Sequence, residues 1–79
     1  MKKIDVSLNG EFAVVLFEFL AEFLEGRREI IGMLPSEKIV LCEIEAQLEK
    51  KLIEPFQDDY ESIVNIARAK IEKDISSSE

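Results

Sequence analysis

The chain has 79 residues, of which 47% are hydrophobic and 34% are charged, a composition typical of one folded domain rather than a disordered segment. The 17 acidic side chains outnumber the 10 basic ones, and the net charge of -7 argues against direct binding to nucleic acid or to an anionic membrane surface. With no histidine and one cysteine, the chain lacks the residues for Ser-His-Asp or Cys-His catalysis, an imidazole zinc site or an internal disulfide.

The first nine residues predict a short β-strand or an extended arm. Ile4, Val6 and Leu8 alternate with polar residues, as in a half-buried strand. The start of the chain is not typical of a signal peptide, because the first long apolar run begins only after Asp5 and Asn9. We therefore expect a protein of the reducing cytoplasm.

The next segment allows two structures, a helix from Gly10 to Glu25 or a hairpin that turns at Asn9-Gly10. The spacing of four glutamates favours the helix, with Asn9 as its N-cap. At about 100° per residue these glutamates share a sector about 60° wide, whereas a strand would place the first two on opposite faces. This acidic stripe consists of Glu11, Glu18, Glu22 and Glu25.

Apart from the acidic stripe, the first helix is apolar on every side, so it must be covered nearly all round. Its apolar run is too short to span a bilayer and is interrupted by Glu18 and Glu22. A chain of this length buries only about 60 to 65% of its unfolded surface, which leaves part of the cover to a second copy. We expect a homo-oligomer, with a dimer favoured, whose interface contains Phe12, Val15, Leu16, Phe19, Phe23, Ile39, Cys42 and Ala46.

A connection should follow the first helix. Gly26 suits a left-handed helix end, and Gly32 and Pro35 break the segment after it. We expect the apolar side chains of this connection to pack under the core, although they could also contact a partner. These side chains are Ile30, Ile31, Met33 and Leu34.

The second helix is expected to start with Ser36 as its N-cap and to end near Ile53. It carries two apolar stripes, which imply two packing partners: the first helix for one, and the third helix or a second subunit for the other. Cys42 is expected to be a buried and unreactive small hydrophobe. The first stripe is Leu41, Ile44, Leu48 and Leu52, and the second stripe is Ile39, Cys42, Ala46 and Ile53.

The third helix is expected to follow directly, with Pro55 in its first turn, and the tail 76–79 should be disordered. Residues 1–75 then form a single helical domain. The polar face of this helix contains Glu61, Asn65, Arg68 and Glu72, and its apolar stripe contains Phe56, Tyr60, Ile63, Val64, Ala67, Ile71 and Ile75.

Carboxylates are the only abundant reactive groups, so a divalent-metal site is the sharpest enzyme hypothesis that the sequence offers. Glu18 with Glu22, Glu22 with Glu25, and Asp58 with Glu61 have the three- or four-residue spacing that lets two helical carboxylates share an ion. The run Glu22-Phe23-Leu24-Glu25 resembles half of the motif of the small all-helical nucleotide pyrophosphohydrolases of the MazG type, and the other half of that motif is absent. The resemblance implies Mg²⁺-dependent hydrolysis of nucleotides.

The sequence favours a mostly α-helical, three-helix domain that is completed by oligomerisation. We predict a non-enzymatic interaction or assembly protein that needs no cofactor or metal and self-associates through the first helix. One alternative is the nucleotide hydrolase. The other is an acidic decoy, in which the acidic stripe occupies a basic surface on a partner protein.

Overall fold

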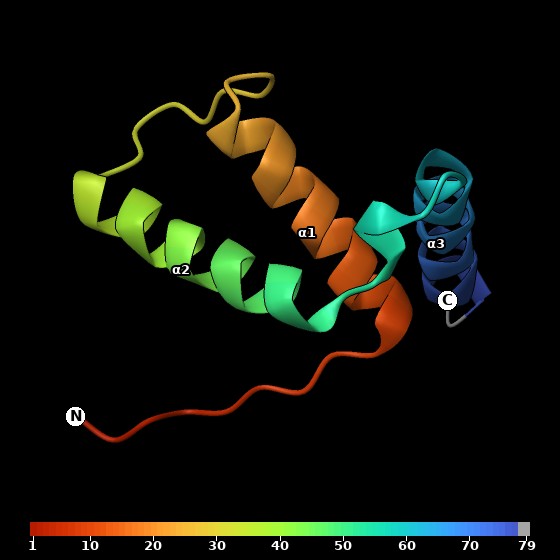
Figure 1. Cartoon of the computed structure of the whole chain (residues 1–79), viewed down its shortest axis with the longest axis horizontal. Coiled ribbons are helices and arrows are strands. Elements are labelled where there is room, and N and C mark those ends of the chain that lie inside the picture. The colour runs from red at the N-terminus through yellow and green to blue at the C-terminus, as the bar shows by residue number, and fades with distance from the viewer. Residues whose placement is uncertain (78–79) are drawn as a thin grey trace.

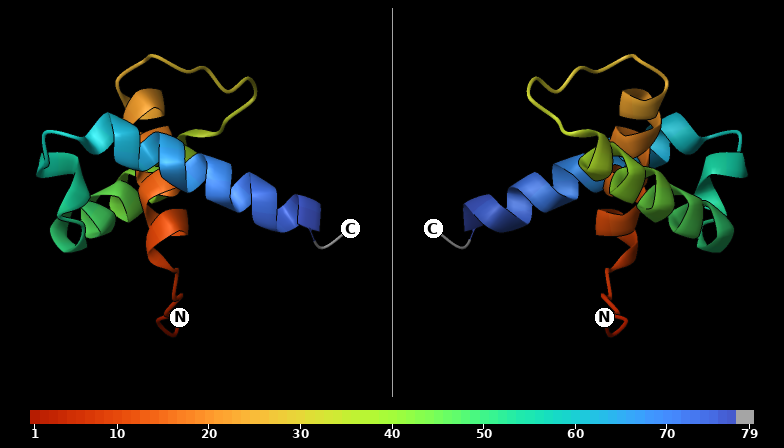
Figure 2. Two further views of the ribbon diagram at one scale, coloured as in Figure 1. Left: turned by 90° about the vertical axis from the view of Figure 1, so that its right-hand side faces the viewer. Right: turned by 90° about the vertical axis from the view of Figure 1, so that its left-hand side faces the viewer.

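The computed structural model describes residues 1–77 as three α-helices and one short 3-10 turn (Figure 1). These are α1 (Gly10–Leu24), α2 (Pro35–Lys51), η1 (Glu54–Phe56) and α3 (Tyr60–Ser77). The predicted all-α class is confirmed, and no strand occurs within the described range. Helix α1 is the centre of the fold, because α2 and α3 both pack on it, and Figure 2 shows α3 crossing it.

The ends of α1 explain why residues 10–24 form a helix and not a hairpin. At the start, the Asn9 side-chain oxygen accepts a hydrogen bond from the Phe12 backbone N–H at 2.9 Å, as expected of an N-cap. At the end, Gly26 has a φ of +83°, and the Arg27 N–H donates to the Glu22 carbonyl at 2.8 Å. This left-handed closure satisfies a carbonyl that would otherwise lack a partner, and Glu25 becomes the C-cap.

The predicted N-cap of α2 was wrong by two residues. Leu34, not Ser36, is the N-cap, and Pro35 is the first helical residue. Proline suits that position because its fixed φ is already helical and its missing N–H needs no partner there. Glu37 completes the start, since its carboxylate accepts the Leu34 backbone N–H at 2.7 Å.

The predicted start of α3 was also wrong. Pro55 lies in η1, and α3 begins at Tyr60. The carbonyl of Asp59 accepts the N–H of Ile63 at 3.0 Å, so the helical hydrogen bonds begin at an aspartate, a residue type that favours helix starts. Phe56 therefore does not join the apolar stripe of α3 and is 73% exposed.

The core lies on two sides of α1. Val14 packs with Val64 and Ala67 of α3, and Leu52 and Tyr60 border this cluster. No residue of α2 is fully buried, although its first stripe is half-buried. Among the described side chains, the fully buried apolar ones are Ala13, Val14, Phe17, Leu20, Val64 and Ala67.

The N-terminal residues form an exposed arm rather than a strand in this single chain. Residues 1–9 have no regular structure, and Ile4 and Val6 are 86% and 77% exposed (Figure 1). At the other end, α3 continues through Ser77, the second residue of the expected tail. The side chain of Ile75 and residues 78–79 lie outside the described part of the structure. Within residues 1–77, no helix has both the length and the apolar character needed to cross a bilayer.

Candidate functional site

Three of the four glutamates of the acidic stripe form ion pairs with basic residues of the chain. The Glu11 carboxylate lies 2.7 Å from the Lys70 ammonium of α3, and the Glu25 carboxylate lies 2.8 Å from the Arg27 guanidinium. Glu22 accepts a hydrogen bond from Arg28 and lies 3.9 Å from Arg68. The stripe thus faces α3 and the connection that follows α1.

These pairs change the acidity of the groups that form them. The hydrogen bond from Lys70 holds the pKa of the Glu11 carboxyl below its usual 4.5, and the same contact raises the pKa of Lys70 above 10.5. The hydrogen bond from Arg28 likewise lowers the pKa of Glu22. Both carboxylates are therefore ionised and engaged at neutral pH.

Glu18, the fourth member of the stripe, lies beside Tyr60. Burial, and secondarily the Glu18 carboxylate, raises the pKa of the Tyr60 hydroxyl, so this hydroxyl stays protonated at neutral pH. The hydroxyl oxygen is buried without a hydrogen bond of ordinary geometry in the described part of the chain. The Tyr60 ring itself borders the core cluster of Val14, Val64 and Ala67.

The carboxylates whose spacing suggested a metal site do not come together as a set of ligands in residues 1–77. Within residues 1–77, no three aspartate, glutamate or cysteine side chains converge closely enough to hold a metal ion. Glu22, shared by two of the candidate pairs, is occupied by arginine, and Asp58 and Glu61 are exposed on the surface.

The interface residues predicted on α1 lie at the border between core and surface. Phe12 is 47% exposed, while Val15, Leu16, Phe19 and Phe23 are half-buried. The rings of Phe19 and Phe23 stack with centroids 6.4 Å apart, and the Arg28 guanidinium lies 5.6 Å from the centre of the Phe19 ring. Two helices and one arginine therefore already cover most of α1.

The interface residues predicted on α2 are more open. Ile39 is 69% exposed, Cys42 is exposed and Ala46 is half-buried. The expectation of a buried Cys42 was wrong, because the first stripe of α2 turns toward α1 and leaves the second stripe outside. Ile53, at the end of the second stripe, is 66% exposed.

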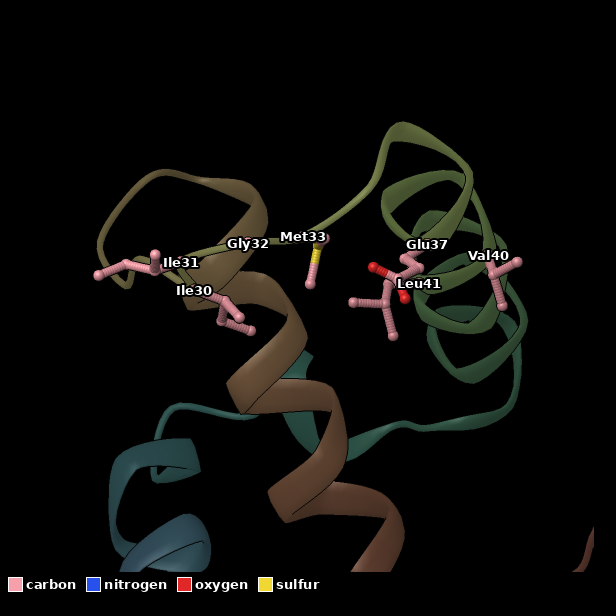
Figure 3. A pocket seen from close by; sticks show the side chains of 7 residues that line it. All are labelled: Ile30, Ile31, Gly32, Met33, Glu37, Val40 and Leu41. Atoms are coloured by element: carbon pink, nitrogen blue, oxygen red, sulfur yellow. The ribbon is translucent and has the colours of Figure 1, made fainter.

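The connection after α1 does not pack under the core as expected. Ile31 is 97% exposed, Leu34 58% and Ile30 40%, because the segment must bridge the separated ends of α1 and α2 (Figure 1). With the start of α2 it borders an open apolar hollow of about 520 Å³ (Figure 3). Sequence reasoning did not include Val40 and Leu41 in this surface. The lining residues are Ile30, Ile31, Gly32, Met33, Glu37, Val40 and Leu41.

A second hollow, of about 420 Å³, lies between the start of α1, η1 and α3. The ion pair between Glu11 and Lys70 stands at its edge, and Ile66, which is 68% exposed, forms part of its wall. The residues missed by the sequence analysis are thus apolar side chains that two elements bring together. The only signal of either hollow in the sequence was the apolar character of residues 30–34, most of which line the first one.

Comparisons with protein-family models, with curated proteins and with solved structures find no match to this chain.

Proposed function

We propose that this chain is a small, acidic, non-enzymatic interaction or assembly protein that works as a homo-oligomer, with a dimer favoured. The observation that carries the proposal is the number of apolar side chains left in solvent. In the described part of the chain, 13 large hydrophobic residues are exposed, whereas six apolar residues are buried. Monomeric proteins rarely leave contiguous apolar surface beyond a few hundred Å².

The exposed side chains belong to elements that a single chain cannot cover. Most of them occur on the arm, around the connection, and along the second stripe of α2, and the others are Phe12, Phe56 and Ile66. Burial of apolar surface contributes roughly 25 cal/mol of favourable free energy per Å², so pairing of these surfaces between two copies stabilises the dimer. A two-fold dimer buries the same surface on both subunits at once.

The acidic stripe supports the two alternative functions less well. A basic partner or a Mg²⁺ ion would first have to displace Lys70, Arg28 and Arg27 from the carboxylates that they neutralise. The exposed apolar side chains need no such exchange.

The deciding experiment is light scattering coupled to size exclusion, at protein concentrations from the low micromolar to the millimolar range. We expect a mass that rises with concentration from the 9.0 kDa monomer toward twice that value. A mass that stays at the monomer value throughout would overturn the oligomer proposal.

A second measurement separates the proposal from the hydrolase alternative. Thermal unfolding should be unchanged by millimolar Mg²⁺ or Mn²⁺. An ion that binds the folded state raises its melting temperature by mass action, so a metal-dependent rise that is lost in Glu22→Gln would favour the hydrolase.

A further inference from the structure

The second stripe of α2 has the spacing of a short coiled-coil seam. Ile39, Cys42 and Ala46 are separated by three and four residues, and Glu49 takes the next position of the same pattern. The seam ends there, because α2 stops at Lys51 and the backbone of Leu52 is extended. This side of α2 is open, since Ile39 is 69% exposed and Cys42 is exposed. The first stripe, which faces α1, lies about 120° around the helix from this seam, so a helix from another molecule has room to lie along the seam without displacing the core.

Charged residues flank this seam in an alternating order. Lys38 and Glu45 lie on one side of it, and Glu43 and Lys50 lie on the other. The ion pairs among residues 1–77 all lie away from α2. Glu43 accepts a hydrogen bond from the Gln47 side chain at 3.1 Å, which leaves its charge without a cation. The charges along α2 thus remain available to a partner.

The order of these charges fits a second copy of the same helix in one orientation. In a parallel, in-register pair, Lys38 faces Glu43 of the partner subunit, and Glu45 faces Lys50 of the partner subunit, so every flanking pair is attractive. In an antiparallel pair that places Cys42 against Ala46 of the partner subunit, Glu43 and Glu45 each face their own copies and repel.

We propose that two copies of this chain pair through α2, parallel and in register, along the seam from Ile39 to Glu49. This inference rests on the proposed homo-oligomer and names its contact surface. Cys42 and Ala46 are small, so the two helix backbones can approach closely at the middle of the seam. Glu49 meets its own copy at the C-terminal end of the seam, which keeps the pairing weak and reversible. Glu49→Leu should therefore tighten the dimer.

Cys42 provides the first test because it is the one cysteine of the chain and is exposed. In the parallel pair the two thiols face each other, and a disulfide forms between them where the two Cα atoms come within about 4.4 to 6.8 Å. Diamide, which takes up the two electrons and two protons, should convert the wild type rapidly to a covalent dimer. A control carrying Cys42→Ser and Asn65→Cys, which moves the thiol to the exposed face of α3, should cross-link much more slowly.

The flanking charges provide a second test that does not depend on cysteine chemistry. Lys38→Glu or Glu43→Lys alone replaces two attractive pairs by repulsive ones and should raise the dissociation constant about tenfold. The double variant restores opposite charges and should recover the wild-type value. Since both side chains are exposed, neither change threatens the fold.

The outcomes separate this inference from the function on which it rests. Cross-linking through Cys42 together with recovery in the double variant supports the parallel seam. A dimer by light scattering that neither cross-links nor responds to the charge changes overturns the seam and leaves self-association standing. A monomer at every concentration overturns both.

Discussion

The ion pair between Glu11 and Lys70 joins the start of α1 to α3 across 59 positions of the sequence. Glu11 is at the same time an acidic residue in the first turn of α1, where the helix dipole favours a negative charge. Only its place in the first turn of the helix could be predicted from the sequence. The pairing depends on how α3 crosses α1, and no local pattern encodes that crossing.

The pKa changes of this pair predict a pH dependence. Because the pKa of Glu11 is lowered in the folded chain, the pair contributes stability above pH 4.5 that is lost as the pH falls through the folded pKa. The raised pKa of Lys70 means that its contribution is complete below pH 10.5 and is lost above the folded pKa. Glu11→Gln should lower the melting temperature at pH 7 and have much less effect at pH 3.

Thermal unfolding followed by circular dichroism measures this dependence. Glu72→Gln is the matched control, since Glu72 is an exposed glutamate of α3 that forms none of the ion pairs of residues 1–77. Equal losses in Glu11→Gln at both pH values would contradict the ion-pair explanation.

Leu20 is the one large side chain of the described structure with no exposed surface. Leu20→Ala removes buried methyl groups from α1 and leaves a cavity, so the free energy of unfolding should fall by about 2 to 5 kcal/mol. Urea denaturation measures the loss. Leu34→Ala, at a 58% exposed position, should cost less than about 1 kcal/mol, and a similar loss in both variants would show that α1 is not the centre of the core.

At the scale of single elements, the sequence predicted those helix ends that are set by hydrogen bonds between neighbouring residues. Asn9 and Gly26 delimit α1 as expected, because a cap and a left-handed turn involve only neighbouring residues. The starts of α2 and α3 were misplaced because good helix-start residues stand close together, as with Pro35 and Ser36. The sequence also could not show which stripe of α2 would face α1, so it misplaced Cys42.

The two ends of α1 predict opposite effects for two glycine substitutions. An added Cβ would meet nothing within 4 Å at either Gly26 or Gly10, so only the backbone conformation distinguishes them. Gly26→Ala forces a side chain into φ +83° and should cost about 1 kcal/mol. Gly10→Ala, within the helix, should instead stabilise the chain by about 0.5 kcal/mol. Urea denaturation compares the two, and destabilisation by both would show that side-chain space, not φ, is decisive.

At the scale of the whole molecule, three helices cannot enclose the apolar residues that this sequence carries. Helix α2 packs on one side of α1 and helix α3 on another, as expected for a chain that has only two other helices to cover the first. The arm is left outside, where Figure 1 shows it running from α1 toward the side on which α2 lies. Lys2 and Lys3 outweigh Asp5 in the arm, whereas the chain as a whole carries a charge of -7. An acidic second subunit therefore attracts the arm as well as offering it apolar cover.

This arrangement predicts that the arm matters to the dimer and not to the monomer. Deletion of residues 2–8 keeps the Asn9 cap and removes only exposed side chains, so the melting temperature of a dilute sample should change by less than about 2 °C. The dissociation constant should rise severalfold, because a strand-like arm such as residues 4–8 gains apolar cover and backbone hydrogen bonds only from another copy. Light scattering over a dilution series measures it, and the double variant Ile4→Ser and Val6→Ser should reproduce the loss at full length. A lower melting temperature in the dilute sample would assign the arm to the monomer, and an unchanged dissociation constant would place it outside the interface.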